Sequence, residues 1–347
     1  MTELNRKPLA GLLVAFFGLM APGASFAADA ARSTLQLVQD RDQLFCGVSE
    51  GLPGFSSPDD NGHWAGLDVD FCRAIAAGVL GDASKVRYTP LSAKVRFTAL
   101  QSSEIDVLSR NTTFTFTRDV NQALDFPATT YFDGQGFMVR KSLNITKPRD
   151  LDGATICVNQ GTTTEQNVAD YFRTRGMQYE LVTFEKSEEA VAAYEAGRCD
   201  VYTTDASGLY AQRLKLQVPA DHVILPDIIS KEPLSPAVRE GDDRWANVVR
   251  WTHYAMLTAE ELGVTQQNVD TALKSESPDI RRLLGVEGDL GSQLGLKPDW
   301  AYQIIKQVGN YAEVFDRNVG AGSPLQIERG QNALPRDGGL QYAPPMR

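Results

Sequence analysis

The sequence predicts an α/β protein built from two similar lobes. Segments typical of strands and helices alternate between residues 43 and 109, and the alternation restarts between residues 155 and 205. This alternation is the pattern of doubly wound sheets with helices on both faces. Without a leader of 27 residues the chain keeps about 320, which is more than one hydrophobic core usually organises. We therefore expect two domains.

The N-terminus has the features of a secretory signal peptide. Arg6 and Lys7 precede an apolar run over residues 9–20, and Ser25-Phe26-Ala27 follows before Ala28. The apolar run is too short to span a bilayer, and no cysteine follows it to carry a lipid. We expect residues 1–27 to be removed, which leaves an exported protein that is free in solution.

The chain is acidic. Its formal net charge is −10, and the loss of Glu3, Arg6 and Lys7 with the leader makes the charge −11. An exported protein of this charge is poorly suited to nucleic acids or to anionic membrane surfaces. We expect neither of them as a partner.

The first half of the chain has the order β-α-β-α-β. Between Gly66 and Gly81, apolar residues recur at the three-four spacing of a buried helical face. The loop over 50–55 breaks the first strand and leaves Glu50 and Phe55 at its carboxyl end, where open α/β sheets bind ligands. The expected strands are 43–49, 85–89 and one that begins at Asp106, and the second helix is 93–101.

The second half repeats this order, and residues 193–203 resemble residues 99–109, which is a weak internal repeat. The expected strands are 155–159, 179–184 and 199–203, with Thr204 and Asp205 after the last; one helix opens at 160–165, and another runs over 188–196 with Ser187 as its cap. The C-terminal part adds an irregular extended segment over 225–243, helices over 244–258 and 298–314, and a tail from residue 320 that is either clamped or mobile.

One stretch, residues 106–126, combines an arginine with hydroxyl and amide side chains. Before Arg118 come Asn111, Thr112, Thr113, Thr115 and Thr117. A guanidinium matches a carboxylate bidentately, and neighbouring hydroxyls can fix the orientation of what it holds. The stretch therefore suits a small zwitterion. The alternative is a threonine-rich edge strand with a solvated arginine.

A second polar stretch opens the helix after residue 159. Thr162 and Glu165 match a capping box, in which the threonine satisfies amides at the helix start. The same free amides and threonine hydroxyls could receive a carboxylate. Both interpretations can hold together.

The four cysteines are expected to form disulfides rather than a metal site, because an exported chain meets an oxidising compartment and none of them has C-x-x-C spacing. Three pairings are possible. We favour Cys46–Cys72 and Cys157–Cys199, since each then stays within one lobe. Four buried free thiols are the alternative.

These features together resemble the periplasmic solute-binding proteins of the polar amino acid class, solute-binding family 3, over roughly residues 34 to 260. The start GVSEGLPGFSSPD, the helix entry over 66–72 and Cys157 with Cys199 are most similar to subunits that bind general L-amino acids for ABC permeases. The resemblance implies a periplasmic binding protein-like type II fold, in which a two-segment hinge joins two α/β lobes with the ligand in the cleft. Lobe 1 would comprise residues 34–138 and 229–347, and lobe 2 residues 139–228.

The resemblance also implies roles for individual residues. Arg118 matches the arginine that binds the α-carboxylate of the ligand, and Asn111 and Thr113 match positions that contact the carboxylate or the ammonium. Asp205 matches the carboxylate that takes the α-ammonium.

The second lobe is expected to add carboxylate contacts from its Gln-Gly-Thr-Thr segment, through Thr162 and above all Thr163. The first loop departs from the family pattern, because many relatives carry an aspartate and a stacking aromatic there. Glu50 could face the side chain of the ligand and Phe55 could form an apolar wall. The alternatives are a solvated carboxylate and a core residue.

The implied function is that of a periplasmic substrate-binding component of an ABC transporter for L-amino acids, with broad specificity. The implied partners are the amino acid and the inner-membrane permease subunits with their ATPase, and the protein is expected to be a monomer without cofactor, metal or catalytic residues. A receptor whose closed form docks on a chemosensor would use the same cleft.

An enzyme on the same scaffold is the main alternative, since some cyclohexadienyl dehydratases, which act on prephenate or arogenate, share this fold. Such an enzyme needs a general acid in the cleft, and Glu50 is the one candidate. The sequence contains no H-E-x-x-H, G-x-S-x-G, P-loop or dinucleotide fingerprint. The sequence therefore favours a binding protein.

Overall fold

A three-stranded parallel sheet forms the first part of the fold. The computed structural model describes residues 1–2 and 32–347, so the expected signal peptide lies outside the described residues apart from its first two. The strand order is β4-β1-β5, with β1 at Leu44–Ser49, β4 at Val86–Leu91 and β5 at Val107–Leu108. Helices α2 (Leu67–Leu80) and α3 (Arg96–Gln101) connect these strands, so the predicted β-α-β-α-β order is confirmed.

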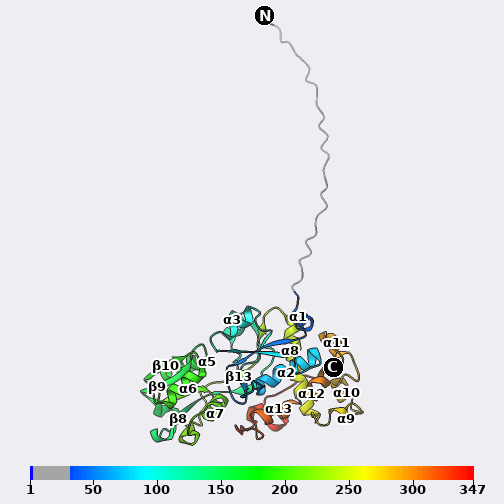
Figure 1. Ribbon diagram of the computed structural model, residues 1–347. Coiled ribbons are helices and arrows are strands. Elements are labelled where there is room, and N and C mark those ends of the chain that lie inside the picture. The colour runs from blue at the N-terminus through cyan, green and yellow to red at the C-terminus, as the bar shows by residue number, and fades with distance from the viewer. Residues whose placement is uncertain (3–31) are drawn as a thin grey trace. The chain divides into compact units, whose positions relative to one another are not determined.

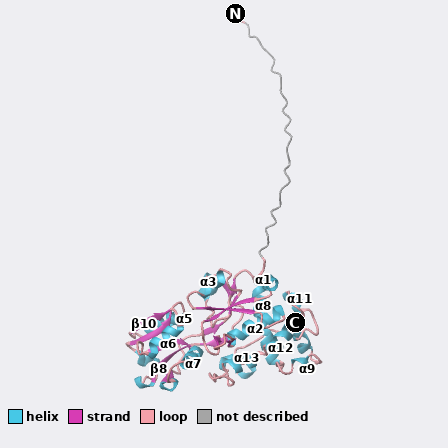
Figure 2. Ribbon diagram, viewed as in Figure 1, coloured by secondary structure: helices cyan, strands magenta, loops and turns pink. Residues whose placement is uncertain are grey.

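A five-stranded sheet forms the second part, in the order β10-β9-β11-β8-β12. Its strands β8, β9 and β10 are labelled in Figure 1, and Figure 2 shows the strands in magenta. β9 pairs in parallel with β10 and β11, whereas β8 pairs antiparallel with β11 and β12. The bounds are β8 Gln135–Arg140, β9 Ala154–Asn159, β10 Tyr179–Phe184, β11 Val201–Asp205 and β12 His222–Ile224, with helices α5 Thr163–Thr174, α6 Ser187–Glu195 and α7 Ala206–Arg213. The expected lobe limit between residues 138 and 139 stays a prediction, and it falls inside β8.

Two short antiparallel strand pairs link segments that are far apart in the sequence. β7 (Tyr131–Asp133) pairs with β13 (Glu232–Leu234), and β6 (Leu124–Asp125) pairs with β14 (Val238–Arg239). Because β7 leads into the five-stranded sheet and β13 leaves it, we call this pair the crossover strands. Part of the segment over 225–243, expected to be irregular, is therefore regular strand.

The C-terminal helices cover the first part of the fold. Helix α12 packs on α2, and α13 packs on α8, as the colours of Figure 1 allow the reader to follow. The expected helix over 298–314 is two helices, because the chain breaks at Gly309 (φ 99°) and Asn310 caps the second helix through Glu313. The remaining bounds are α1 Thr34–Arg41, β2 Ser57–Pro58, β3 Trp64–Ala65, α4 Phe116–Asn121, α8 Asp243–Glu261, α9 Val269–Ala272, α10 Pro278–Leu283, α11 Leu290–Leu294, α12 Trp300–Gln307 and α13 Tyr311–Asn318.

The C-terminal tail is clamped, which decides between the two alternatives that the sequence left open. The Asn332 side chain accepts a hydrogen bond from the Phe132 amide and donates one to the Phe132 carbonyl at 3.0 Å. Gln341 donates to the carbonyl of Thr129 at 3.3 Å. The tail therefore braces the strand β7 of the crossover pair.

Two expected helix starts were wrong. α3 begins at Arg96 instead of residue 93, and Ser187 is the first residue of α6, where Lys186 takes the cap position without a side-chain bond. The hydroxyl of Ser187 donates to Asn159 at 3.3 Å instead. No helix among the described residues is long and apolar enough to cross a membrane.

Both disulfides form as predicted. Cys46 of β1 is bonded to Cys72 of α2, and Cys157 of β9 is bonded to Cys199. Each bond fastens a helix or a turn to the sheet beside it. All four cysteines of the chain are thus paired.

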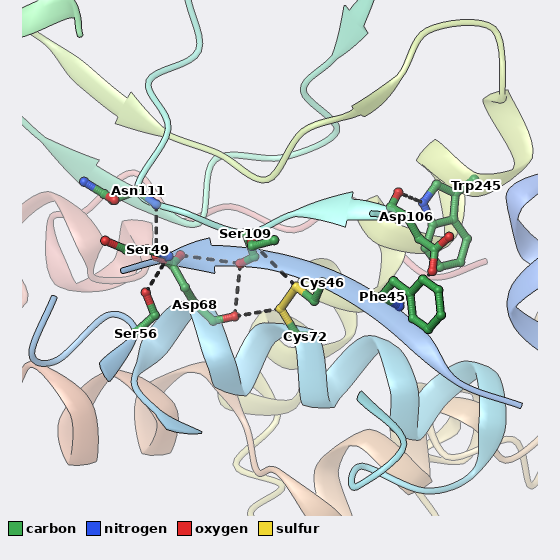
Figure 3. Close-up of a disulfide and its surroundings, with 11 residues drawn as sticks. Phe45, Cys46, Ser49, Ser56, Asp68, Cys72, Asp106, Ser109, Asn111 and Trp245 are labelled. Atoms are coloured by element: carbon green, nitrogen blue, oxygen red, sulfur yellow. Dashed lines mark hydrogen bonds between the residues drawn. A yellow bond between two sulfur atoms is a disulfide. The ribbon is translucent and has the colours of Figure 1, made fainter. Parts of the chain in front are cut away.

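A buried carboxylate next to the first disulfide ties α2 to the polar stretch after β5 (Figure 3). Asp68 is 4% exposed and accepts a hydrogen bond from the Asn111 amide at 2.9 Å, while its carbonyl accepts one from the Ser109 hydroxyl at 3.0 Å. Burial raises the pKa of Asp68 to about 7, against the opposing effects of the Asn111 amide and the Arg110 guanidinium. Asp68 therefore takes up a proton on folding near pH 5.

The first prediction concerns Asp68→Asn. Because the pKa of Asp68 is higher in the folded chain than in the unfolded one, its contribution to stability is present below about pH 4 and is lost as the pH rises to about 7. Without the titrating group, the fall in the free energy of unfolding between pH 4.5 and 6.5 becomes shallower by up to about 1.4 kcal/mol per pH unit. Urea unfolding of ligand-free protein measures this slope, with Asp227→Asn as exposed control; parallel slopes in wild type and Asp68→Asn contradict it.

The second prediction concerns the Cys157–Cys199 bond, which closes a loop of 42 residues. Replacing both cysteines by serine should lower the free energy of unfolding by about 3–4 kcal/mol, because the unfolded chain regains the freedom of that loop. The measurement is urea unfolding of the double variant against wild type under oxidising conditions. An unchanged midpoint would show that the bond contributes nothing.

Candidate functional site

A small cavity of about 40 Å³ lies where strand ends from both sheets meet. This volume has room for a few water molecules. A roomier hollow of about 730 Å³ lies beside the crossover strands and the tail, but it does not collect the carboxyl ends of strands from both sheets, where α/β folds bind ligands. The residues that line the small cavity are Ala93, Arg96, Arg110, Asn111 and Thr113 from the first part, and Asn159, Thr162, Thr163, Thr164, Ser187, Thr204 and Asp205 from the second.

Two buried guanidiniums, those of Arg96 and Arg110, line this cavity, and a third, that of Arg118, is bonded to the lining residue Thr113. Arg96, Arg110 and Arg118 are 3%, 6% and 7% exposed. Arg118 Nη1 donates to the Thr113 carbonyl at 2.7 Å, and Arg110 Nε donates to the Leu91 carbonyl at 2.8 Å. Burial lowers the pKa of all three, that of Arg110 to about 10. Such buried cations are costly unless anions pair with them.

Asp205 is the one carboxylate among the residues that line the cavity. It ends β11 and is 6% exposed. Burial, together with the nearby carboxylates of Asp133 and Glu232, raises its pKa well above the ordinary value. The Asn111 side chain donates to it at 3.4 Å, which joins the two parts of the fold across the cavity.

Glu232 of β13 binds both parts of the fold at once. Its Oε2 accepts from the hydroxyls of Thr113 at 2.6 Å and Thr163 at 2.8 Å. Its Oε1 accepts from Asn167 at 2.7 Å and Ser230 at 2.6 Å. This carboxylate is 1% exposed and has two donors on each oxygen, so it is fully satisfied.

The structure brings most of the predicted site residues together. Asn111, Thr113, Thr162, Thr163 and Asp205 line the cavity. Arg118 does not line it directly but holds the carbonyl of Thr113, from within α4 rather than from an edge strand. In this conformation the hydroxyls of Thr113 and Thr163 are already engaged by Glu232, and the hydroxyl of Thr162 donates to the Asn159 carbonyl at 2.6 Å.

Glu50 and Phe55 lie outside the cavity. Phe55 is fully buried and packs edge-on against Tyr131, so for this residue the core interpretation holds and the apolar-wall interpretation was wrong. Glu50 is exposed and borders a separate hollow with Lys215. Its charge is nevertheless close enough to Arg110 to favour the charged guanidinium.

Sequence reasoning missed Arg96, Arg110 and Glu232. Arg96 could have been found, because it stands three and four residues before Ala99 and Leu100 on the buried face of the predicted helix, where an arginine is out of place. Glu232 gave no such signal, since it lies in a segment without periodicity.

Nothing in the described part of the chain gathers three or more metal-ligating side chains at a potential ion site. The cavity instead combines guanidiniums, hydroxyls, amides and one carboxylate, groups that recognise a charged organic solute through hydrogen bonds. No proton-transfer pair or nucleophile is needed to account for these residues.

Comparison with known proteins identifies the chain. The family of bacterial extracellular solute-binding proteins, family 3, matches residues 44–268. The general L-amino acid-binding periplasmic protein AapJ of Rhizobium johnstonii is 59% identical over 95% of this chain and 96% of its own. The glutamate/glutamine/aspartate/asparagine-binding protein BztA of Rhodobacter capsulatus is 53% identical over 96% of this chain and 99% of its own.

A solved structure of similar sequence supports the fold. An ABC transporter periplasmic binding protein from Brucella ovis, with glutathione bound, superposes with a TM-score of 0.90 and is 58% identical, covering 91% of this chain and 100% of its own. The predicted periplasmic binding protein-like type II fold is thereby confirmed. The chain belongs to family 3 of the bacterial extracellular solute-binding proteins.

Proposed function

We propose that this protein is the periplasmic binding component of an ABC transporter and that it binds L-amino acids in the cavity between its two lobes. The observation that carries the proposal is the buried arrangement of guanidiniums on one side and Asp205 on the other. AapJ and BztA, which are named as amino-acid-binding proteins, align with nearly the whole chain. The protein is a binding protein and not an enzyme, and the dehydratase alternative finds no support among the relatives.

The proposed binding mode divides the charges of the amino acid between the lobes. Arg118 of the first lobe takes the α-carboxylate, and Asp205 of the second takes the α-ammonium. Each charge-assisted hydrogen bond contributes roughly 1.5–3 kcal/mol. Both form at once only when the lobes close, so the ligand stabilises the closed state. Asn111, Thr113, Thr162 and Thr163 then orient the bound groups.

The lobe division is part of this proposal. We infer that residues 135–228 form lobe 2, that residues 34–134 and 229–347 form lobe 1, and that the crossover strands β7 and β13 are the hinge. The cavity volume of about 40 Å³ supports a motion of the two lobes. A ligand larger than a few water molecules can enter only after the lobes have moved apart. Lobe contacts such as that between Asn111 and Asp205 would break in the open state.

Glutathione is a second candidate ligand. The Brucella ovis protein was solved with glutathione bound, and its structure resembles this one over nearly the whole chain. The γ-glutamyl end of glutathione carries a free α-ammonium and α-carboxylate, so it presents the same two groups to Arg118 and Asp205. Titration with glutathione beside the L-amino acids separates these ligands.

The third prediction concerns Arg118→Ala and Asp205→Ala. Each variant should bind L-amino acids at least about 100-fold more weakly, because removal of one charge leaves its partner buried and unpaired. Isothermal titration of refolded, ligand-stripped protein measures the affinity, with two D-amino acids as stereochemical controls. Rejection of the D-forms shows that the site reads the substituents of the α-carbon.

Arg149→Ala and Asp227→Ala are matched exposed controls and should bind as wild type does. Thermal unfolding followed by circular dichroism shows whether each variant keeps its fold. Retained affinity in both Arg118→Ala and Asp205→Ala would refute the site assignment.

The fourth prediction concerns oligomeric state and closure. Light scattering should give the mass of one chain, and small-angle X-ray scattering should give a smaller radius of gyration with a saturating L-amino acid than without it. A dimer mass would contradict the monomer, and an unchanged radius with proven binding would contradict closure. The permease and ATPase are the proposed membrane partners, which ligand-loaded protein should stimulate.

A further inference from the structure

Arg96 is a buried cation without a hydrogen-bond or ion-pair partner among the described residues. Its side chain is 3% exposed, and its guanidinium has no hydrogen bond or ion pair within the described part of the chain. The centroid of the Phe97 ring lies 4.7 Å from the Arg96 Cζ. The Asp205 carboxylate is near enough to favour the charged guanidinium, but it forms no ion pair with Arg96. An unpaired buried charge costs several kcal/mol, so a chain that keeps one needs a reason.

The position of Arg96 supplies a reason, because it lines the same cavity as Asp205 and Asn111. The Oδ1 atom of Asn111 is also buried without a hydrogen-bond partner. Two unsatisfied polar groups that border one cavity are typical of a site whose remaining partner is the ligand.

The charges around the cavity show what that partner must be. Three guanidiniums are buried there, and Asp205 is the single carboxylate among the lining residues. An α-carboxylate on Arg118 and an α-ammonium on Asp205 cancel each other in the ligand and leave Arg96 unpaired. Asp205 lies near both Arg96 and Arg110. Arg110 is different, because its Nε also donates to the Leu91 carbonyl and the carboxylates of Glu50 and Asp68 lie near it as well. A second anionic group on the ligand would pair with Arg96.

We propose that Arg96 binds a second carboxylate of the ligand, so that the site prefers dicarboxylic zwitterions of the L series to neutral amino acids. This inference rests on the proposed function and narrows its substrate class. Acidic amino acids and γ-glutamyl peptides both carry the required group, the first on the side chain and the second at the far end of the peptide. The distance between the two carboxylates decides between them.

The test compares ligands that differ mainly in the second charge. L-glutamate and L-glutamine are nearly equal in shape, and isothermal titration of the ligand-stripped wild type should give at least about tenfold tighter binding of L-glutamate. In Arg96→Gln this ratio should fall to within about threefold of one. In Arg96→Lys, which keeps the charge but loses the planar fork, part of the preference should remain.

A second comparison tests whether the second carboxylate lies at the far end of a γ-glutamyl peptide. If the ligand is a γ-glutamyl peptide, glutathione should bind at least about tenfold more tightly than its glycine ethyl ester, and Arg96→Gln should remove that difference as well. Arg149→Gln is the matched control for loss of an exposed arginine that does not line the cavity. If Arg96→Gln does not fold, Arg96→Lys and the wild-type comparisons decide.

Three outcomes separate the two proposals. If wild type binds charged and neutral ligands equally, or if Arg96→Gln weakens L-glutamate and L-glutamine by the same factor, Arg96 is a structural residue and this inference fails while the proposed function stands. If no L-amino acid and no γ-glutamyl peptide binds, the proposed function fails. A collapsed ratio in Arg96→Gln supports both.

Discussion

The Glu232 carboxylate is the interaction on which the geometry of the site depends. It joins Thr113 after β5, Thr163 and Asn167 of α5, and Ser230 just before β13, so one buried group fixes three segments relative to one another. Thr113 in turn holds the Arg118 guanidinium through its carbonyl. A fully satisfied buried carboxylate costs little to keep, but it becomes costly as soon as any donor leaves. If the lobes open as proposed, the Thr113 or Thr163 hydroxyl must exchange this carboxylate for water or for a ligand.

Asp68 performs the corresponding task within the first lobe. Asn111 has a positive φ of 25°, which residues other than glycine rarely adopt, and its backbone amide donates to the Asp68 carboxylate. The hydrogen bond holds the strained residue in place while its side chain reaches Asp205. Cys72, one turn after Asp68 on α2, fastens the same helix to β1 (Figure 3). Strain at the site is thus offset by a rigid support behind it.

The sequence predicted the repeated strands and helices, but it missed residues whose positions depend on contacts between distant segments. Periodicity and breaker residues located β1, β4 and β5 of the first sheet and β9, β10 and β11 of the second, whereas β12 was not expected. The Asp205 and Asn111 positions followed from strand ends and the family pattern. Phe55 could not be placed, because whether a loop aromatic turns to the core or to the cleft depends on Tyr131, which is far away in sequence. The role of Glu232 was missed for the same reason, since its four hydrogen-bond donors come from segments spread over more than a hundred residues. Arg96 alone carried a readable sign, a charge on a buried helical face.

The balance of buried charge connects recognition with closure. Burial and the nearby carboxylates of Asp133 and Glu232 raise the pKa of Asp205. Burial and the neighbouring guanidiniums lower the pKa of Arg96, and Asp205 offsets only part of this effect. A ligand that brings an ammonium to Asp205 and carboxylates to the guanidiniums relieves both repulsions together. The relief is available only when water is excluded, because water screens the same charges in the open state. Selectivity for ligand charge and the free energy of closure therefore have one physical origin, and a solute that lacks one of the charges loses both.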